Sequence, residues 1–355
     1  MAAAGVSVLP SDGTISLARG IPSPDLLPVG ELEACAAAAI ARDGRIALNY
    51  GPPGGYAPLR EWVAARHAVE PTQVLLTPGS MLALTLLIGE TVRPGTRVRV
   101  ESPTYDRVLK TLRAAGAELV VDGPAEVHYV LPTFHNPTGR TLTAAERVAV
   151  VEQAIATQTL LIEDDPYGLL RFEGEQPPSL HRLLHERGAG ELAVHCSSFS
   201  KSVAPGLRVG YLVLPPALAA RVEARALATY VSPPLLPQAQ LFEFLDRGLL
   251  EPHLARARAG LRARRDALAE HVPGATWTVP EGGYFLWAEL PVPTAGLLAA
   301  AQAAGVTFEL GSSFSPDGRE ERAARLAFSL ETPERIREAV VRLGHVLAEQ
   351  EVSHA

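Results

Sequence analysis

Short apolar runs alternate with longer amphipathic segments through the centre of the chain. A run that is apolar on both faces predicts a buried strand, and an apolar residue at every third or fourth position predicts a helix. The expected strands are Val74–Thr77, Val98–Glu101, Glu118–Val121, His128–Leu131, Leu160–Glu163, Ala193–Ser197 and Val209–Leu214. The expected helices are Met81–Thr91, Tyr105–Ala115, Ala144–Ala156 and Leu180–Arg187. This alternation indicates an α/β fold, in which helices cover both faces of a mainly parallel sheet.

The pattern changes near Pro252. The segments expected around the central region are a helix at Glu31–Arg42, a long arginine- and alanine-rich helix from His253 to about His271, strands at Ala275–Val279, Tyr284–Glu289 and Ala324–Ser329, and a closing helix at Pro333–Glu349. We therefore divide the chain into an N-terminal segment of residues 1–45, a large domain of residues 46–250 and a small α+β domain of residues 251–355. The N-terminal segment is expected to pack with the small domain.

Charge and composition exclude several classes of protein. The net charge of −7 leaves no broad basic surface for nucleic acid or an anionic membrane. No uninterrupted apolar stretch reaches about 18 residues, so no membrane span is expected, and the first residues lack the pattern of a secretory signal. The cysteines, Cys35 and Cys196, have neither disulfide nor metal-ligand spacing. We therefore expect a cytoplasmic protein without a metal site.

Lysine is rare in this chain, since Lys110 and Lys201 are the only two, against thirty arginines. Arginine replaces lysine in most surface roles, but it cannot lose its proton and attack a carbonyl carbon. Lys201 follows an expected strand in a loop that also carries Ser198, Ser200 and Arg208. This setting suggests a Schiff-base lysine beside a phosphate. A solvated surface lysine, in a genome that prefers arginine, is the alternative.

Several expected strands end in residues that can carry chemistry, at the edge where open α/β sheets bind ligands. Gly79, Ser80 and Met81 begin a helix whose free N–H groups can bind a phosphate, although a serine N-cap explains them equally well. Tyr105 follows the next strand, where an aromatic ring either packs in the core or stacks on a planar ligand.

The later strands are followed by an amide and by two acids. Asn136 opens an Asn-Pro-Thr-Gly sequence, for which a structural turn is the simpler explanation. Asp164 and Asp165 end a buried strand, where adjacent carboxylates are costly unless a cation or a hydrogen-bond donor meets them. Tyr167 lies three residues after Asp164. Each motif alone says little, but their order along the chain is specific.

In this order the motifs resemble those of the fold-type I pyridoxal 5′-phosphate enzymes, namely the class I and II aminotransferases and, within them, the α-aminoadipate aminotransferase group. The aminotransferase-like domain of certain GntR-type regulators is similar as well. The resemblance extends from about Ile15 to Glu349 and is most specific at residues 50–55, 136–139, 163–167 and 198–208. It implies a mainly parallel seven-stranded sheet with helices on both faces, plus a smaller α+β domain.

The resemblance also implies catalytic roles for Lys201, Asp164 and Tyr167. Lys201 matches the lysine that forms a Schiff base with the cofactor aldehyde, and Asp164 matches the carboxylate that pairs with the protonated pyridine nitrogen. Asp164 is preferred to Asp165 because Tyr167 then keeps the family's spacing of three residues. Once the substrate has displaced the lysine, the freed amine is expected to move a proton as a general acid and base.

The remaining roles that the resemblance implies concern the cofactor. Tyr167 and Asn136 are expected to hydrogen-bond the ring oxygen, and Tyr105 is expected to stack on the ring. The group expected around the phosphate consists of Gly79, Ser80, Met81, Ser198, Ser200 and Arg208. Tyr50 matches the tyrosine that reaches the phosphate in the other subunit, which implies a homodimer with shared active sites.

The implied activity is transfer of an amino group between an L-amino acid and a 2-oxo acid. Arg325 matches the arginine that binds the substrate α-carboxylate, with Asn136 beside it, and Arg19 is either a ligand for a second carboxylate or a surface residue. Two alternatives stay open. One is an elimination, cyclisation or oxidative enzyme with the same cofactor. The other is a non-enzymatic cofactor-binding module, which the start of the match near residue 15 disfavours because no DNA-binding segment precedes it.

Overall fold

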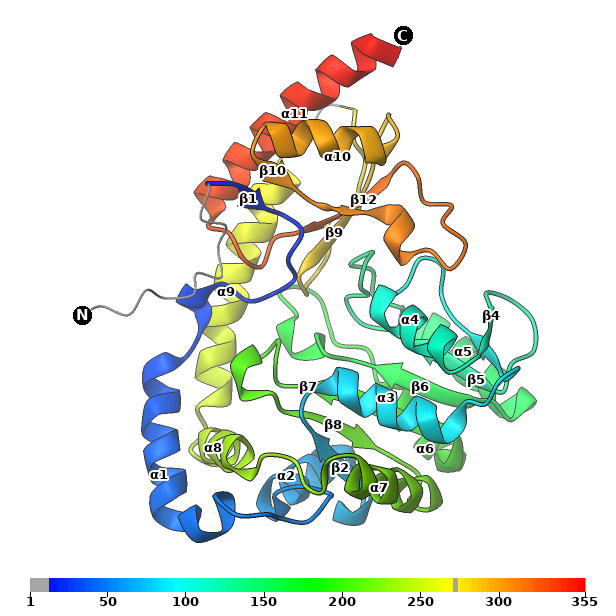
Figure 1. Ribbon diagram of the computed structural model, residues 1–355, viewed down its shortest axis with the longest axis vertical. Coiled ribbons are helices and arrows are strands. Elements are labelled where there is room, and N and C mark those ends of the chain that lie inside the picture. Colours follow the sequence, from blue (N-terminus) through cyan, green and yellow to red (C-terminus); the bar gives the residue numbers. More distant parts are fainter. Residues whose placement is uncertain (1–12, 271–273, 355) are drawn as a thin grey trace.

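The computed structural model describes residues 13–270 and 274–354, and a seven-stranded sheet forms its centre (Figure 1). The strands are β2 (Val74–Thr77), β3 (Arg97–Arg99), β4 (Glu118–Val120), β5 (Val127–Val130), β6 (Leu160–Asp164), β7 (Ala193–Ser198) and β8 (Gly210–Val213). Their order is β2-β8-β7-β6-β5-β3-β4, and only β8 runs antiparallel to its neighbours. The expected mainly parallel sheet is therefore confirmed.

Helices cover both faces of this sheet because the residues of each strand alternate between the two faces. In β7, Val194 and Cys196 pack in one core, while Ala193 packs in another. The first core is covered by α3 (Ser80–Thr91), α4 (Asp106–Ala114) and α7 (Pro216–Tyr230). The opposite face carries α2 (Ala57–His67), α5 (Ala144–Thr157), α6 (Leu180–Glu186) and α8 (Leu235–Asp246). The α/β architecture predicted from the sequence is thereby confirmed.

A smaller antiparallel sheet lies above the central sheet in Figure 1, and its order is β11-β12-β9. Its strands are β9 (Phe285–Glu289), β11 (Glu309–Leu310) and β12 (Ala323–Ala327). The helices around it are α9 (Leu250–Ala269), α10 (Thr294–Ala303) and α11 (Pro333–His354). These elements share one apolar core that includes Leu286, Leu326 and Leu343.

The N-terminal segment contacts both parts of the molecule. β1 (Ile15–Ser16) pairs in parallel with β10 (Val306–Thr307), beside the smaller sheet. α1 (Val29–Ala47) packs along α8, and Figure 1 shows this pair at the edge of the larger sheet. The chain between β1 and α1 therefore passes close to the carboxyl ends of the central strands. The boundaries proposed for three separate domains stay a prediction.

One expected strand is wrong. Residues 275–279 form no strand and make only a single bridge, in which the backbone groups of Thr276 and Glu289 exchange two hydrogen bonds of 2.9 Å. After this bridge, residues 277–280 do not pair with β9. Arg265 instead donates a hydrogen bond of 2.9 Å to the carbonyl oxygen of Pro280. The long helix α9 begins earlier than expected, at Leu250, and the end expected at His271 lies outside the described residues.

Candidate active site

A cavity of about 680 Å³ lies at the carboxyl ends of β6 and β7, between the two sheets. The expected site residues that line it are Arg19, Ser80, Met81, Tyr105, Asn136, Asp164, Tyr167, Ser198, Ser200, Lys201, Arg208 and Arg325. Two expected residues do not line it. Gly79 lies just behind the wall as the N-cap of α3, and Tyr50 is 83% exposed on the surface of this chain.

Lys201 lies half-buried in the turn after β7, and several contacts fix its position. Its Nζ donates a hydrogen bond of 2.6 Å to the carbonyl oxygen of Gly20 and lies 5.5 Å from the centre of the Tyr284 ring. The hydroxyl of Tyr284 donates to the backbone carbonyl of Lys201 at 2.7 Å. Burial, together with the charges of Arg325 and Arg208, lowers the pKa of Lys201 to about 8. Such an amine is neutral in a useful fraction of molecules near neutral pH, as a nucleophile requires.

Asp164 ends β6 with its carboxyl group buried in the cavity wall. Its Oδ2 accepts a hydrogen bond of 2.6 Å from the hydroxyl of Tyr129. Its Oδ1 is buried and has no hydrogen-bond partner among the described residues. Burial raises the pKa of Asp164 to about 7, although the bond from Tyr129 opposes this shift. A carboxyl group in this state is completed by a cationic donor, which would satisfy Oδ1 and stabilise the charged form.

The start of α3 and the guanidinium of Arg208 form a cradle for an anion. Gly79 caps the helix with a φ of 92°, and Ser80 opens it, so the free N–H groups of the first turn face outward. Arg208 donates to Ser200 Oγ at 3.5 Å and to the carbonyl oxygen of Pro78 at 3.3 Å. The φ of 92° favours glycine at position 79, and a side chain there would also require the guanidinium of Arg208 to shift.

Arg325 projects from β12 between two aromatic rings. Its guanidinium carbon lies 4.3 Å from the centre of the Phe285 ring and 4.7 Å from that of Phe314. Its two terminal nitrogens donate to Asn136 Oδ1 at 3.0 Å and to the carbonyl oxygen of Ala18 at 2.6 Å. Burial lowers the pKa of Arg325, but an arginine keeps its charge in proteins. A planar cation held in this way is suited to a carboxylate.

Tyr167 and Tyr105 frame the middle of the cavity. The Tyr167 ring meets that of Phe285 edge to face, with 5.7 Å between their centres. Tyr105 is half-buried at the N-cap of α4. Burial raises the pKa of Tyr105 to about 12 and that of Tyr167 well above its ordinary value. Both side chains therefore remain neutral phenols, which can donate hydrogen bonds near neutral pH.

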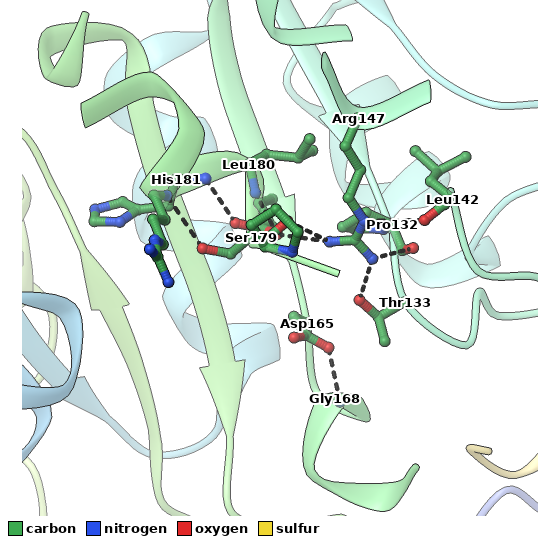
Figure 2. Close-up of polar contacts among 12 residues, drawn as sticks. Pro132, Thr133, Leu142, Arg147, Asp165, Gly168, Ser179, Leu180 and His181 are labelled. Carbon is green, nitrogen blue, oxygen red and sulfur yellow. Dashed lines mark hydrogen bonds and ion pairs between the residues drawn. The ribbon is translucent and has the colours of Figure 1, made fainter. Parts of the chain in front are cut away.

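The loop that carries Asn136 is anchored by the buried side chain of Arg147 (Figure 2). Arg147 has no exposed surface, and it donates hydrogen bonds to the carbonyl oxygens of Leu142 at 3.0 Å and Pro132 at 2.7 Å. It also donates to Thr133 Oγ1 at 2.8 Å, so both ends of the loop are held. Because residues 132–142 enclose Asn136, this anchor helps to place the Asn136 amide beside Arg325.

Sequence reasoning missed several residues that line the cavity or contact its lining side chains. Tyr129 is one, although a tyrosine inside an otherwise apolar strand is a usable signal for a buried hydrogen bond. Tyr284, Phe285 and Phe314 had no such signal, because their contacts with Lys201 and Arg325 depend on how the two sheets meet. The carbonyl groups of residues 18 and 20 were also not expected, since backbone groups leave no mark in a sequence.

The described residues contain no helix that is long and apolar enough to cross a membrane. Within the same part of the chain, no group of three or more histidine, cysteine, aspartate or glutamate side chains is arranged to hold a metal ion.

Pyridoxal 5′-phosphate fits the groups that the cavity presents. Its phosphate suits the cradle formed by α3 and Arg208, and its pyridinium N–H is the kind of donor that Asp164 Oδ1 lacks. Its aldehyde is an electrophile, and the lowered pKa of Lys201 leaves part of that side chain as the neutral amine that can attack it. The same cavity keeps Arg325 for a carboxylate.

Comparisons with known proteins agree with this geometry. Residues 14–129 and 123–343 match the family model of aminotransferase class I and II. The chain is 34% identical to the 2-aminoadipate transaminase of Thermus thermophilus, over 94% of this chain and 90% of that protein. It is 29% identical to aromatic-amino-acid aminotransferase 1 of Thermococcus litoralis, over 97% of this chain and 90% of that protein.

Solved structures give the same result. The α-aminoadipate aminotransferase LysN of Thermus thermophilus, complexed with N-(5′-phosphopyridoxyl)-L-leucine, superposes with a TM-score of 0.90 and 32% identity, over 96% of this chain and 93% of that one. A kynurenine aminotransferase of Pyrococcus horikoshii gives a TM-score of 0.89 at 29% identity, over 96% and 92%. This chain therefore belongs to the class I and II aminotransferases, which are fold-type I enzymes that use pyridoxal 5′-phosphate to transfer amino groups.

Proposed function

We propose that this cavity is where an L-amino acid and a 2-oxo acid exchange an amino group, with Lys201 as the catalytic amine. One observation carries the proposal. An amine with a pKa of about 8 shares a cavity with a buried aspartate, one oxygen of which has no hydrogen-bond partner in the described part of the chain. When bound, pyridoxal 5′-phosphate supplies an aldehyde for amines and a ring that withdraws electrons from the substrate Cα.

Lys201 acts first as a nucleophile and then as a carrier of a proton. In its neutral form the Nζ atom can accept the proton of the substrate Cα and later return a proton to the reacting system, a role that typically contributes about 10²–10⁴-fold. The hydrogen bonds at Gly20 and from Tyr284 limit the positions that this side chain can take. A held amine of this kind transfers the proton along a short and repeatable path.

Asp164 supplies a negative charge where a cationic ring nitrogen is to be held. Tyr129 occupies one carboxylate oxygen, and the other, which has no hydrogen-bond partner among the described residues, would be available to the ring nitrogen. Meeting a cation lowers the pKa of a buried carboxyl group, so Asp164 is ionised once the site is filled. Its charge then favours the protonated ring, the form that withdraws electrons best.

Arg325 and Asn136 orient the substrate. The guanidinium binds the α-carboxylate, and the amide, which already accepts a hydrogen bond from Arg325, keeps that guanidinium in place. Holding the carboxylate would decide which bond at Cα is aligned for cleavage once the cofactor is bound, and hence whether the Cα proton or carbon dioxide is lost.

We also propose that the protein works as a homodimer in which Tyr50 serves the site of the partner. Large apolar side chains lie exposed along α1, namely Val29, Ile40 and Ile46, and Leu48 and Tyr50 continue them. An exposed apolar surface of this kind is typical of an interface between subunits. Mixing Lys201→Ala protein with Tyr50→Ala protein should restore activity, because one site of the mixed dimer then has both residues. No recovery in a verified mixed dimer would contradict shared sites.

A cytoplasmic location is the last part of the proposal. Cys35 and Cys196 are both buried free thiols, as is usual in a reducing compartment. Fractionation of the source cells would test this location directly.

A screen of amino donors tests the proposed activity. The purified, cofactor-loaded protein would be mixed with single amino acids while the visible absorbance of the bound cofactor is followed. At least one donor should change the absorbance and release its 2-oxo acid, and a 2-oxo acid should reverse the change. Release of ammonia without any need for a 2-oxo acid would instead favour an elimination or oxidative enzyme.

A further inference from the structure

A second cavity, of about 650 Å³, lies next to the candidate active site, and we call it the rear cavity. The chain at the end of β6 supplies both cavities, because successive side chains of a strand point to opposite faces of the sheet. Asp164 lines the active site, whereas Asp165, the next residue, lines the rear cavity. Pro166 and Ser198 line both. These two residues therefore belong to the partition between the cavities.

The turn that carries Lys201 is part of the same partition. Ser200 and Lys201 line the active site, while Phe199 and Ser202 line the rear cavity. Ser202 is buried, and its Oγ has no hydrogen-bond partner among the described residues. A molecule in the rear cavity would therefore meet an unpaired hydroxyl group, and it would lie directly against the turn that holds the catalytic amine.

Flat side chains gather in the rear cavity, namely those of Trp62, His67, His181, His195, Phe199 and Tyr211. The centre of the His67 ring lies 4.6 Å from that of His195 and 5.6 Å from that of His181. Burial lowers the pKa of His67 to about 2 and that of His181 to about 3, so both imidazoles are neutral. The His181 side chain is almost fully buried, yet its ring makes no hydrogen bond to another described residue. Neutral rings with unused polar atoms favour a flat aromatic ligand.

The charged groups at this cavity are matched, with one exception. Arg182 and Glu186 form an ion pair of 2.7 Å, and both are exposed. The guanidinium carbon of Arg66 lies 5.0 Å from the centre of the Trp62 ring. The exception is the carboxyl group of Asp165, which forms no ion pair with a basic side chain in residues 13–270 and 274–354.

Asp165 is half-buried, and its Oδ1 accepts a hydrogen bond of 2.8 Å from the backbone N–H of Gly168 (Figure 2). His195 and Arg147 act on its charge only from farther away, because both lie closer to Glu163, at 3.2 Å and 3.8 Å. Burial raises the pKa of Asp165, and the neighbouring charge of Glu163 adds to this shift. A cation beside Asp165 would stabilise its ionised form.

We propose that the rear cavity is a second binding site, which takes a flat aromatic compound with a cationic, amidine-like group. The aromatic part would pack among the rings of the lining. An amidinium has two parallel N–H donors that match the two oxygens of a carboxylate, which Asp165 provides. An anionic compound would instead meet the charge of Asp165, and a neutral one would leave that charge without a partner.

The first test compares two ligands on the unaltered, cofactor-loaded protein. Calorimetry would measure the affinity for benzamidine and for benzamide, a neutral compound of nearly the same shape. Benzamidine should bind once per chain, and benzamide should bind at least about tenfold more weakly because it lacks the charge. Equal affinities, or no binding of benzamidine, would overturn the proposal. This comparison does not depend on whether a variant folds.

The two consecutive acids supply matched variants for a second test. Asp165→Asn should weaken benzamidine binding by roughly ten- to a hundredfold, whereas Asp164→Asn should leave it within about twofold. Circular dichroism would confirm that both variants are folded. Unchanged binding in a folded Asp165→Asn protein, or a loss confined to Asp164→Asn, would overturn the proposal.

The rear cavity does not depend on the proposed reaction, so the two proposals fail separately. If no amino donor changed the absorbance of the cofactor, the proposed function would fail while benzamidine binding stayed as expected.

Discussion

Two adjacent acids on β6, Glu163 and Asp164, lie in different environments, because successive side chains of a strand point to opposite faces of the sheet. Glu163 accepts hydrogen bonds of 3.0 Å from the backbone N–H groups of Leu180 and His181, at the start of α6 (Figure 2). It also contacts His195 Nδ1 at 3.2 Å and Arg147 at 3.8 Å. Asp164, one residue later, has Tyr129 alone as a partner and leaves one buried oxygen unpaired among the described residues.

The pKa values of the two acids follow from this difference. Although burial opposes it, the surrounding donors and His195 lower the pKa of Glu163, whereas burial raises the pKa of Asp164 to about 7. Both acids are buried to a similar extent, so burial does not distinguish structure from function. The completeness of the hydrogen bonding does, because evolution tolerates an unsatisfied buried group chiefly where a ligand completes it.

Arg147 and Arg325 differ in the same way as Glu163 and Asp164, because one has all its side-chain nitrogens bonded and the other does not. Arg147 is bound through its Nε and both terminal nitrogens, while Arg325 has a buried Nε without a partner in the part of the chain that the structure describes. The unsatisfied members of both pairs, Asp164 and Arg325, line the cavity, whereas Glu163 and Arg147 do not.

The largest expected effect comes from removing the catalytic amine. Lys201→Ala should lose nearly all turnover, because the other lysine of the chain, Lys110, is paired with Asp106 on α4, yet it should remain folded. Lys110→Ala, the matched lysine change, should keep measurable turnover because its side chain is 72% exposed. Turnover and circular dichroism would be measured for both variants. An inactive Lys110→Ala beside an active Lys201→Ala would reverse the assignment.

Substitution of Asp164 should mainly affect activity, and substitution of Glu163 should mainly affect stability. Asp164→Asn should lower kcat by about 10²–10³-fold with little loss of stability, because it removes an electrostatic group aimed at the ligand. Glu163→Gln should instead lower the free energy of unfolding by about 3–5 kcal/mol, because it disrupts a buried ionic network. Urea unfolding and steady-state turnover measured on both proteins give the comparison. Equal effects on both properties would remove the distinction.

The paired arginines offer a second test of the same kind. Arg147→Met should lower the free energy of unfolding by about 3 kcal/mol, since it leaves several carbonyl groups without their donor and removes the cation that lies 3.8 Å from Glu163. Arg325→Met should change stability less and should raise the KM for every amino acid, because each has an α-carboxylate. A stable Arg147→Met protein would show that the loop around Asn136 needs no anchor.

The last prediction is a dependence of stability on pH in the cofactor-free protein. Because the pKa of Asp164 rises from 3.8 to about 7 on folding, the folded state keeps a proton that the unfolded chain has released. The stability from this group is therefore fully present below pH 4 and is lost as the pH rises towards 7. Unfolding followed between pH 4 and 8 should show this slope in the original protein and not in Asp164→Asn. Identical slopes would contradict the raised pKa.

The sequence predicts the central sheet well and the surrounding helices less completely. The strand at Val74–Thr77 is observed with the expected bounds, because an apolar run between polar turns has few other conformations. The helix α8 was not expected, since its buried residues occupy most of its circumference and leave no clear apolar stripe. The run at residues 275–279 has the composition of a strand but finds only one backbone partner.

The residues of the candidate site also fall into two groups, those that could be identified from the sequence and those that could not. Lys201 and Asp164 could be identified because a rare lysine and a costly buried acid each follow an expected strand, whereas Arg325 was assigned only through the resemblance to the aminotransferases. The bond from Tyr129 could not, because it depends on the register that pairs Tyr129 with Ile162 across β5 and β6. The aromatic rings around Arg325 come from segments far apart in the sequence, and only the packing of the smaller sheet brings them together.

Chemical trapping of the cofactor tests the central claim most directly. The cofactor-loaded protein would be reduced with borohydride and digested, and mass spectrometry would locate the phosphopyridoxyl group. Because the chain has only two lysines, the result is unambiguous. The account predicts that the group is on Lys201 and that prior incubation with an amino donor prevents the labelling. Labelling of Lys110 instead, or a protein that retains no cofactor on either lysine, would contradict it.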